Sequence, residues 1–421
     1  MEKFVIDANK VSHYGEGKCN DNLLVVGSTG SGKTMSVTIP QVLNAEEDSY
    51  VITVTKRDQL DLMVKSFKSK GYDTFVIDLS SPKRGNADFD PMNYIENNSD
   101  AKEFASAVIG VSKNLEEARD PYWDDAAKSL ICAEVAGLFE KAAAEGKAKP
   151  TLADLFRLHQ RLALSEGERG GFTKSTLDSF FEELKREDPS SYAYRCWGAV
   201  KGLAPKTVSC ILSTVNTAYS NVFVHEAERS VRVRWKANFS LIGEKKTAFI
   251  IYTSPVDKCQ QAFANILYAQ VFRTLFKEAE KREGCRLKVP VHIVCDDFAC
   301  GCKIPNFPEY ISVMRSCGIT ATVLLQSLAQ LKSMYGPDGA RVVMDNCDQI
   351  LYLGSNNLDS CTEMAKRANV SLKEMVELPI GEAYAFRRGE PPRKTVRYQT
   401  YSDKRYLEIA ENLYTNKEKG E

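Results

Sequence analysis

The chain has 421 residues, of which 43% are hydrophobic, and its 56 Lys and Arg balance 56 Asp and Glu. This length suits one large core or two domains, since single hydrophobic cores stop growing at about 250–300 residues. The formal net charge of zero excludes a chain-wide attraction to nucleic acid, so any contact with DNA or RNA must come from local basic patches.

The first informative stretch is NLLVVGSTGSGKTMSVTIPQVL, residues 22–43, in which a short apolar run leads into a glycine-rich turn. The turn fits G-x-x-x-x-G-K-[ST], the phosphate-binding P-loop. It lies between an expected strand, Leu23–Val26, and a helix expected to begin at Gly32 or Lys33. A chance match occurs in about one chain in a hundred of this length. The alternative is a tight glycine turn that binds no nucleotide.

Each type of residue in this turn has a chemical task. Glycines allow backbone N–H groups to close around phosphate oxygens, the lysine reaches the β and γ phosphates, and the hydroxyl of Thr34 binds Mg²⁺. We therefore expect a site for ATP and Mg²⁺ formed by Gly27, Ser28, Thr29, Gly30, Ser31, Gly32, Lys33 and Thr34.

Further along the chain, β-branched strands are expected at Tyr50–Thr55 and Thr74–Leu79, with a helix over 57–70 between them. Alternation of strands and helices predicts right-handed crossovers and a parallel sheet. Residues 101–220 then show mostly helical periodicity, which indicates an all-α domain inserted into the sheet domain. Strands are expected again at 231–242, 247–253, 291–295, 320–326, 349–354, 382–388 and 395–400, with a long helix over 258–283.

The predicted fold is therefore α/β: a P-loop nucleotide-binding domain with a mostly parallel sheet and an inserted all-α domain. The predicted domains are residues 1–100 and 229–421 for the two parts of the nucleotide-binding domain, and 101–228 for the insertion. The twelve cysteines include no repeated C-x-x-C pairs, which favours reduced thiols over zinc or a disulfide framework. The closest group, Cys295, Cys300 and Cys302, matches no zinc pattern.

A second motif, VHIVCDDFA, places two carboxylates directly after an apolar strand. A P-loop ATPase needs an acid there to hold the water shell of Mg²⁺ and to polarise the attacking water. We expect Asp296 to be this Walker B residue and a Mg²⁺ ligand. Asp297 stands where hydrolytic ATPases more often have Glu, and its side chain is shorter by about 1.5 Å, which predicts slow hydrolysis or completion of the site by a partner subunit. The alternative role for the pair is a helix N-cap.

Gln326 ends the apolar run TATVLLQ, at the edge of an open α/β sheet where ligands bind. A polar side chain at this position can sense the γ-phosphate and couple its loss to the following segment. The alternative is that Gln326 only caps the helix that begins at Ser327.

Taken together, these motifs resemble the TraG/TraD-type coupling proteins of type IV secretion, the conjugative DNA-transfer ATPases. The resemblance rests on the P-loop, ADFDPMNYI, DPYWDDAAKSL, VHIVCDDFACGCKIPNF, and MRSCGITATVLLQSLAQLKSMYG followed by NCDQILYLGS. It implies a RecA-like motor that forms a homo-hexamer with a central channel for DNA. Such proteins recruit a relaxase bound to single-stranded DNA, or protein substrates, to the type IV secretion channel at the cytoplasmic face of the bacterial inner membrane.

The resemblance also assigns Arg315 to a basic position that could act on the γ-phosphate across a subunit interface; an exposed salt bridge is the alternative. The chain departs from the family pattern at Cys317, Asp297 and Cys300, where a basic residue, Glu and Asn are more usual. It also lacks the N-terminal transmembrane helices of the family, so an association with the membrane would require an anchor absent from this sequence.

Two other functions remain open at this stage. One is a nucleotide-binding docking module for secretion substrates with little ATP turnover, which Asp297 and the zero net charge favour. The other is a chromosome-segregation pump of the FtsK/HerA group, against which the helical insertion and the MRSCGI and LYLGS blocks argue.

Overall fold

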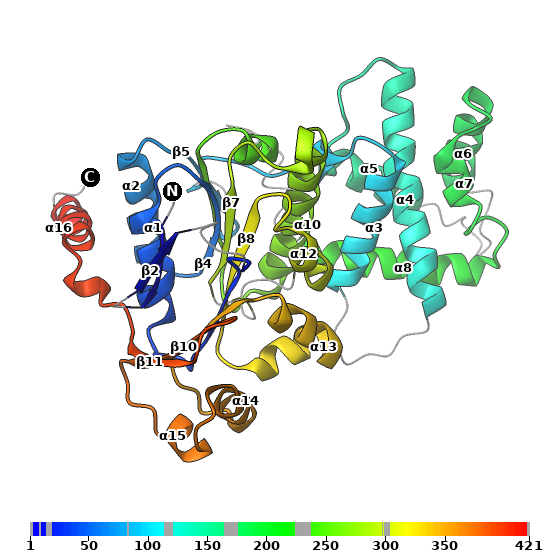
Figure 1. Ribbon diagram of the computed structural model, residues 1–421. Helices are drawn as coiled ribbons and strands as arrows, with labels where there is room; N and C mark the ends of the chain where they lie inside the picture. Colours follow the sequence, from blue (N-terminus) through cyan, green and yellow to red (C-terminus); the bar gives the residue numbers. More distant parts are fainter. Residues whose placement is uncertain are drawn as a thin grey trace. The chain divides into compact units, whose positions relative to one another are not determined.

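The computed structural model of the chain describes residues 3–7, 10–13, 19–81, 84–112, 121–163, 176–223, 237–296, 298 and 304–418 (Figure 1). It divides into two compact units. The sheet unit consists of Met1–Ala87, Ala237–Asp257 and Val271–Glu421, and the helical unit of Asp88–Lys236 and Lys258–Gln270. Domain boundaries at residues 100 and 228 stay a prediction.

The sheet unit is built on a nine-stranded sheet in the order β11-β10-β9-β3-β8-β7-β4-β6-β5. All pairs from β9 to β5 are parallel, whereas β10 and β11 form an antiparallel edge. This confirms the predicted α/β fold with a mostly parallel sheet. The strands are β3 (Leu23–Val26), β4 (Ser49–Val54), β5 (Asp73–Asp78), β6 (Thr247–Tyr252), β7 (Val291–Cys295), β8 (Ile319–Leu325), β9 (Gln349–Tyr352), β10 (Glu382–Arg387) and β11 (Arg393–Val396).

Both faces of this sheet are buried, as a parallel sheet between helices requires. On β3, Leu23 and Val25 join an apolar cluster with residues of α1 and α2, while the equally buried Leu24 and Val26 alternate onto the other face. Figure 1 shows α1, α2 and α16 on one side of the sheet and α12 and α13 on the other. The helices are α1 (Ile39–Asn44), α2 (Arg57–Ser69), α10 (Lys258–Glu280), α12 (Phe307–Val313), α13 (Leu328–Asp345), α14 (Leu358–Ala368), α15 (Leu372–Val376) and α16 (Lys404–Glu418).

A short antiparallel hairpin of β1 (Lys3–Asp7) and β2 (Lys10–His13) precedes the sheet, and the sequence patterns did not predict it. Two strand predictions were wrong in part. Phe239–Gly243 forms a 3₁₀ turn, because the Asn238 side chain accepts a hydrogen bond from the Ser240 N–H and caps it; residues 231–236 lie outside the described part. β11 ends at Val396, because its hairpin register pairs Val396 with the first residue of β10.

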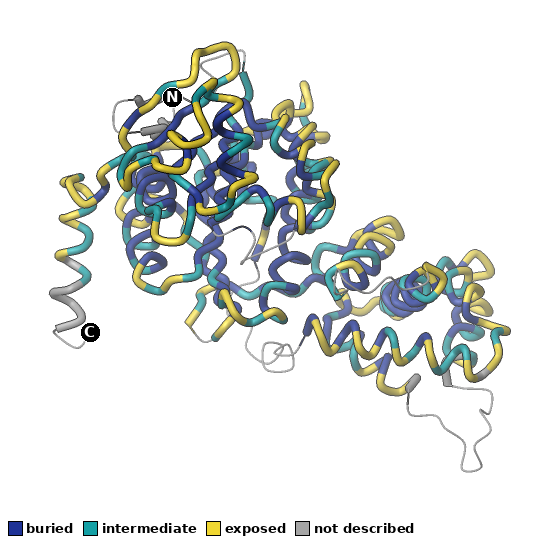
Figure 2. Tube along the Cα trace, turned by 90° about the horizontal axis from the view of Figure 1, so that it is seen from below, coloured by how far each residue is buried: buried dark blue, intermediate teal, exposed yellow. Residues whose placement is uncertain are grey.

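The helical unit is organised around α4 (Pro121–Ala144), which packs against the other helices of the unit. The buried residues of α4 lie between Asp124 and Gly137, and Figure 2 colours buried residues dark blue. Gly137 permits the close approach of α6, since a Cβ atom there would lie 2.8 Å from Phe180 Cε1. The other helices are α3 (Asn98–Ser112), α5 (Leu152–Ala163), α6 (Thr176–Glu187), α7 (Tyr192–Trp197) and α8 (Pro205–Val222).

A buried polar network crosses this unit. The fully buried Glu134 carboxylate lies 2.7 Å from Nδ1 of His159 and accepts a hydrogen bond of 3.0 Å from the Tyr219 hydroxyl. Nε2 of His159 faces the Asn216 side-chain oxygen at 3.1 Å, so both ring nitrogens face acceptors. Burial opposes the charged ring, but attraction and hydrogen bonding to Glu134, with the bond to Asn216, outweigh it and raise the pKa of His159 above its ordinary value.

Two cysteines of the helical unit lie together. The sulfur atoms of Cys132 on α4 and Cys196 on α7 are 3.8 Å apart. The hydrogen bond with Cys132 lowers the pKa of Cys196 to about 7, with smaller support from Tyr192 and Arg195, against the opposing effect of burial. Cys196 is therefore expected to ionise more readily than an ordinary cysteine.

Candidate functional site

The glycine-rich loop begins directly after β3, at the carboxyl edge of the sheet, and neighbouring strands hold its first residues on both sides. The Gly27 N–H donates to the Leu325 carbonyl at the end of β8 (3.0 Å). The Ser28 N–H donates to the Gly354 carbonyl just after β9 (2.8 Å). Because β3 pairs in parallel with both strands, the loop starts in the middle of the edge where α/β sheets bind ligands.

The loop has the conformation that a phosphate cradle requires. Gly30 and Gly32 have φ angles of +81° and +86°, which residues with a Cβ atom rarely adopt. At Gly27 a Cβ atom would lie 2.5 Å from Ser31 Oγ. The buried ammonium of Lys33 donates to the carbonyls of Gly27 (2.7 Å) and Ser28 (3.3 Å).

A helix follows the loop without a break. The backbone is helical from Lys33 onward, through a π-helical turn at Thr34–Thr38 that continues into α1. The buried Ser31 hydroxyl has no hydrogen-bond partner within the described part of the chain. A glycine-rich turn, a buried lysine, an unsatisfied hydroxyl and a helix N-terminus are together the features that bind a phosphate group, so these residues fit a nucleotide.

Asp296 and Gln326 end two neighbouring strands at this same edge. Asp296 follows β7 and is buried, and half-buried Gln326 follows β8, the strand between β7 and β3. Two strand spacings separate β3 from β7, about 10 Å, so the structure brings these two residues to the side of the loop that begins at Gly27. Asp297, Cys300 and Cys302 lie outside the described residues.

The backbone of Gln326 bonds to α13 and to the segment before α14. Its N–H donates to the Gln330 side chain in α13 (2.9 Å), and its carbonyl accepts from the Ser355 hydroxyl (3.5 Å). α13 has Ser327 as its N-cap residue, without a capping bond from that side chain. The Leu328 N–H, at the start of α13, donates to the Ser360 hydroxyl of α14 (3.0 Å).

Arg315 lies elsewhere. It is exposed and precedes β8, whereas the glycine-rich loop follows the carboxyl end of β3, which runs parallel to β8. The seven residues of β8 separate the two edges by roughly 20 Å. Within one chain, the structure does not bring Arg315 to the loop.

Two contacts with the loop were not predicted from the sequence. The segment 354–357 bonds to it twice, at Gly354 and through the Asn356 N–H, which donates to the Ser28 hydroxyl (3.0 Å). The half-buried Arg397 donates from Nη1 to the Ser31 carbonyl. The LYLGS block points to the first contact, but no local pattern marks Arg397, which is 366 residues away from Ser31.

The described residues contain no group of three or more His, Cys, Asp or Glu that could hold a metal ion. A metal ion at the loop would therefore need ligands of another kind, such as the Thr34 hydroxyl and phosphate oxygens, beside a single carboxylate. No helix among the residues described is long and apolar enough to cross a membrane.

Comparison with models of known protein families identifies the family of this chain. The family model for type IV secretory system conjugative DNA transfer matches residues 2–368. The chain belongs to this family. The resemblance to TraG/TraD-type coupling proteins of type IV secretion is thereby confirmed. Comparison with curated proteins gives no significant match.

Solved structures of the conjugative coupling protein TrwB and of VirB4 share the fold. The bacterial conjugative coupling protein TrwBdeltaN70, in complex with sulphate, is 17% identical with a TM-score of 0.66, and the match covers 90% of this chain and 85% of TrwB. Plasmid coupling protein TrwB in complex with ADP and Mg²⁺ is 16% identical with a TM-score of 0.64, over 90% and 85% of the two chains. VirB4 of Thermoanaerobacter pseudethanolicus is 12% identical with a TM-score of 0.54, over 95% and 97%. At these identities the likeness shows the fold alone, which is the RecA-like fold predicted from the sequence.

Proposed function

We propose that this chain is an ATP-driven motor that recruits a relaxase–DNA or protein substrate and feeds it to a type IV secretion channel. The observation that carries the proposal is the glycine-rich loop, flanked at one sheet edge by Asp296 and Gln326, in a member of the conjugative DNA transfer family. The coupling protein TrwB, which shares this fold, has been solved with ADP and Mg²⁺ and with an ATP analogue.

The nucleotide would be held by residues Gly27–Thr34. Backbone N–H groups of the loop would donate to phosphate oxygens, and the Lys33 ammonium would leave the Gly27 and Ser28 carbonyls for the β and γ phosphates. The Thr34 hydroxyl and Asp296 would hold Mg²⁺. Bound ATP and Mg²⁺ supply a phosphoanhydride whose cleavage releases free energy.

The other residues of the site would position the attacking water and transmit the loss of the γ-phosphate to neighbouring segments. Asp296 and Asp297 would orient the attacking water and accept its proton. Gln326 would respond to the γ-phosphate, and its backbone bonds to Gln330 and Ser355 would pass the movement to α13 and to the segment before α14. This proposal assigns Gln326 a task beyond a local helix cap.

Assembly into a homo-hexamer completes the proposal. Since Arg315 lies at the opposite edge of the sheet, it could reach a γ-phosphate only in a neighbouring subunit, as an arginine finger supplied in trans. DNA would pass through the central channel and be gripped at its phosphate backbone. The expected location is the cytoplasmic face of the bacterial inner membrane, next to the secretion channel.

The test is ATP hydrolysis by the full chain with and without single-stranded DNA. Lys33→Ala is expected to abolish DNA-stimulated hydrolysis. Lys70→Ala is the matched control, because Lys70 also donates to backbone carbonyls of this helix region, those of Val42, Leu43 and Ala45, but at the far end from the phosphate cradle. If ATP hydrolysis is unchanged in Lys33→Ala, the proposed motor function is refuted.

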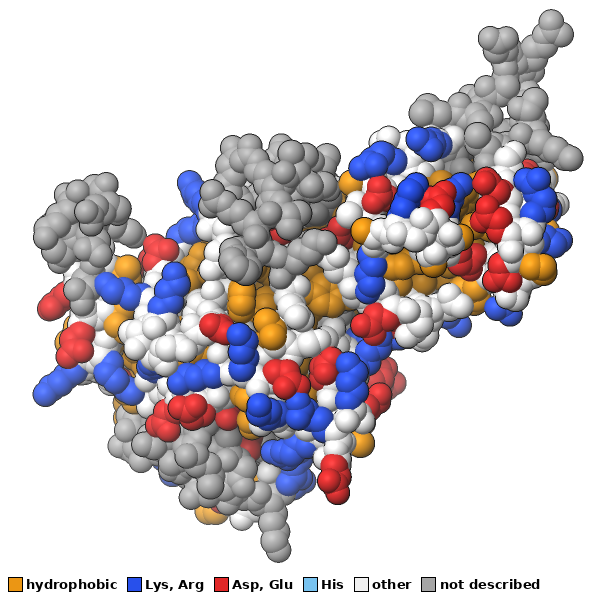
Figure 3. All heavy atoms as spheres, turned by 90° about the horizontal axis from the view of Figure 1, so that it is seen from above, with side chains coloured by type: hydrophobic (Ala, Val, Ile, Leu, Met, Phe, Trp, Pro, Cys, Tyr) orange, Lys and Arg blue, Asp and Glu red, His pale blue; other side chains and the backbone are white. Residues whose placement is uncertain are grey.

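The second candidate is a nucleotide-binding docking module for secretion substrates with little turnover. The short Asp297 side chain and the zero net charge favour it. On the face in Figure 3, Lys and Arg side chains alternate with Asp and Glu, which gives DNA little electrostatic attraction there. Tight ATP binding with negligible hydrolysis, even with DNA and at high protein concentration, would select this candidate.

A further inference from the structure

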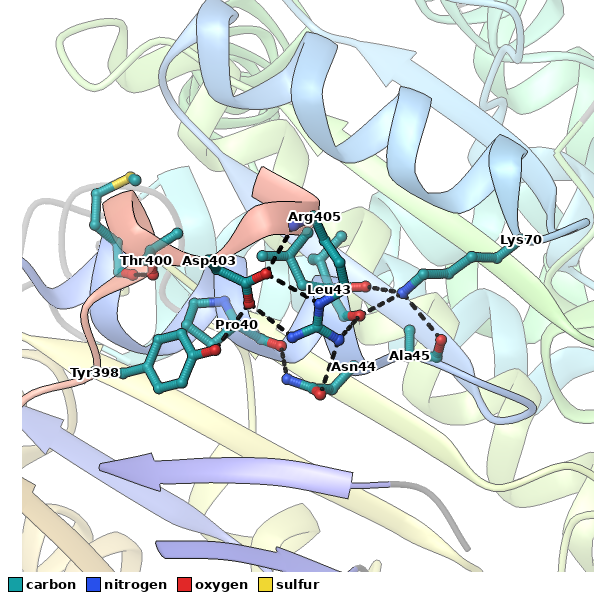
Figure 4. A network of polar contacts seen from close by, with 11 residues as sticks. Pro40, Leu43, Asn44, Ala45, Lys70, Tyr398, Thr400, Asp403 and Arg405 are labelled. Carbon is teal, nitrogen blue, oxygen red and sulfur yellow. Dashed lines mark hydrogen bonds and ion pairs between the residues drawn. The ribbon is translucent and has the colours of Figure 1, made fainter. Parts of the chain in front are cut away.

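The C-terminal part of the chain returns to the glycine-rich loop and runs along the helix behind it. We call residues 397–405 the C-terminal strap. Arg397 bonds to the Ser31 carbonyl, and the Thr400 hydroxyl bonds to the Met35 carbonyl. At the far end of α1, Nη1 of Arg405 donates to the Leu43 carbonyl (2.9 Å) and to Asn44 Oδ1 (3.2 Å) (Figure 4).

The strap is held in this conformation by its own bonds. The Asp403 carboxylate accepts from Nη2 of Arg405 (2.7 Å) and from the Tyr398 hydroxyl (2.8 Å). Burial raises the pKa of Asp403, but these hydrogen bonds outweigh burial and lower the pKa to about 2. The Arg397 N–H donates to the Gly381 carbonyl (3.0 Å), which ties the start of the strap to the residue before β10. Arg397 is therefore presented to the loop by a preorganised segment.

The Arg397 guanidinium packs directly on the backbone of the loop. A Cβ atom at Gly32 would lie 2.4 Å from Nη1 of Arg397, so the absence of a side chain at Gly32 is what admits the guanidinium. Gly32 is the residue before Lys33, the lysine of the cradle. An anion in the cradle would therefore be attracted by two cations of the same chain, one of them supplied by the strap.

The chemistry of arginine suits this place. A guanidinium has five N–H donors in a rigid plane and binds phosphate oxygens in pairs. One donor bond, to Ser31, leaves several donors for a ligand. Because the lysine of a P-loop reaches the β and γ phosphates while the loop itself cradles the α and β phosphates, a second cation packed on the loop at Gly32 suits the α and β phosphates.

We propose that Arg397 is a further nucleotide-binding residue, supplied in cis by the C-terminal strap, which donates to the α- and β-phosphates while it holds the Ser31 carbonyl. This inference rests on the proposed function, since it requires that the loop binds a nucleotide. It also means that the nucleotide is clamped between the loop and the C-terminal part of the same chain.

The experiment measures the dissociation constants of ADP and of a non-hydrolysable ATP analogue, with Mg²⁺, for the full chain and its variants. Arg397→Gln should weaken both nucleotides by the same factor, about 10- to 100-fold, the range for a hydrogen bond to a charged group. Arg397→Lys should recover part of this loss. Lys70→Gln, which removes one positive charge from the far end of α1, should change neither constant by more than about twofold.

A second variant and a second measurement distinguish direct nucleotide binding by Arg397 from a purely structural role of this residue. Arg405→Gln loosens the strap at the far end of α1, and hydrogen exchange of the loop amides without nucleotide reports how far each variant disturbs the loop. Equal losses of affinity in Arg405→Gln and Arg397→Gln would overturn the inference, because the strap as a whole would then be responsible. An affinity that is unchanged in Arg397→Gln, while Lys33→Ala abolishes binding, would overturn the inference alone. If the wild-type chain binds neither nucleotide, the proposed function fails as well.

Discussion

The packing of Arg397 on Gly32 leads to a prediction about alanine substitutions in the loop. Gly30 and Gly32 both have positive φ angles, so an alanine at either position is strained. Their surroundings differ. Nothing lies within 4 Å of a Cβ atom at Gly30, whereas a Cβ atom at Gly32 meets Arg397 Nη1 at 2.4 Å. Comparing Gly30→Ala with Gly32→Ala therefore distinguishes the cost of backbone strain from the cost of losing the contact with Arg397.

The expected magnitudes follow from these two differences. Positive φ costs an alanine roughly 1–2 kcal/mol, which is the whole effect at Gly30. At Gly32 the guanidinium must also retreat by about 1 Å to reach an ordinary contact distance. It then loses its bond to the Ser31 carbonyl, about 1.5–3 kcal/mol for a charged donor. We expect Gly30→Ala to destabilise the sheet unit by about 1–2 kcal/mol and Gly32→Ala by about 2.5–5 kcal/mol.

The assay is native-state hydrogen exchange of β3 and β8 amides in protein without nucleotide. This readout reports on the sheet unit by itself, because a chain with two compact units does not give one two-state unfolding transition. The double variant Gly32→Ala with Arg397→Gln should cost less than the sum of its parts by about 1.5–3 kcal/mol, since the bond to Ser31 that each single variant loses is then lost only once. Equal costs at Gly30 and Gly32, or full additivity in the double variant, would show that Arg397 does not pack on the loop as described.

Three further predictions concern the helical unit. Its stability should fall as pH rises from about 6.5, the ordinary pKa of His, through the raised pKa of folded His159, because the attraction between the protonated ring and the Glu134 carboxylate is lost there. Glu134→Gln should flatten this dependence, measured by native-state hydrogen exchange of α4 amides against pH, and an unchanged profile would contradict the assignment. Gly137→Ala should destabilise the unit by about 1–3 kcal/mol through overpacking against α6. Gly110→Ala, with nothing within 4 Å of its Cβ position, should stabilise it by about 0.5–1 kcal/mol; equal effects of the two variants on native-state hydrogen exchange of α4 amides would refute the packing argument. Finally, the rate of Cys196 alkylation, followed by mass spectrometry as a function of pH, should have its midpoint near pH 7. A midpoint at about pH 8.5, the value of an ordinary thiol, would contradict the lowered pKa of Cys196.

The local pattern of the sequence determined most of the elements and half of the site. Apolar runs followed by turn residues located β3, β7 and β8, because parallel strands buried on both faces are apolar throughout. The glycine spacing at 27–32 defined the loop, since positive φ angles and close approach demand glycine. Placing Asp296 and Gln326 at strand ends was sufficient to predict that they share one edge.

Tertiary structure alone decided how distant segments complete the loop. The 3₁₀ turn at Phe239–Gly243 stands where part of a strand was predicted, and the Asn238 side chain caps it by bonding to the local backbone in place of a sheet. Arg397 stands in a stretch that reads as a strand, and only the hairpin register that ends β11 at Val396 frees it to reach Ser31. Local patterns encode backbone preference and burial, whereas a bond between residues 366 positions apart depends on where the whole sheet places their two strands.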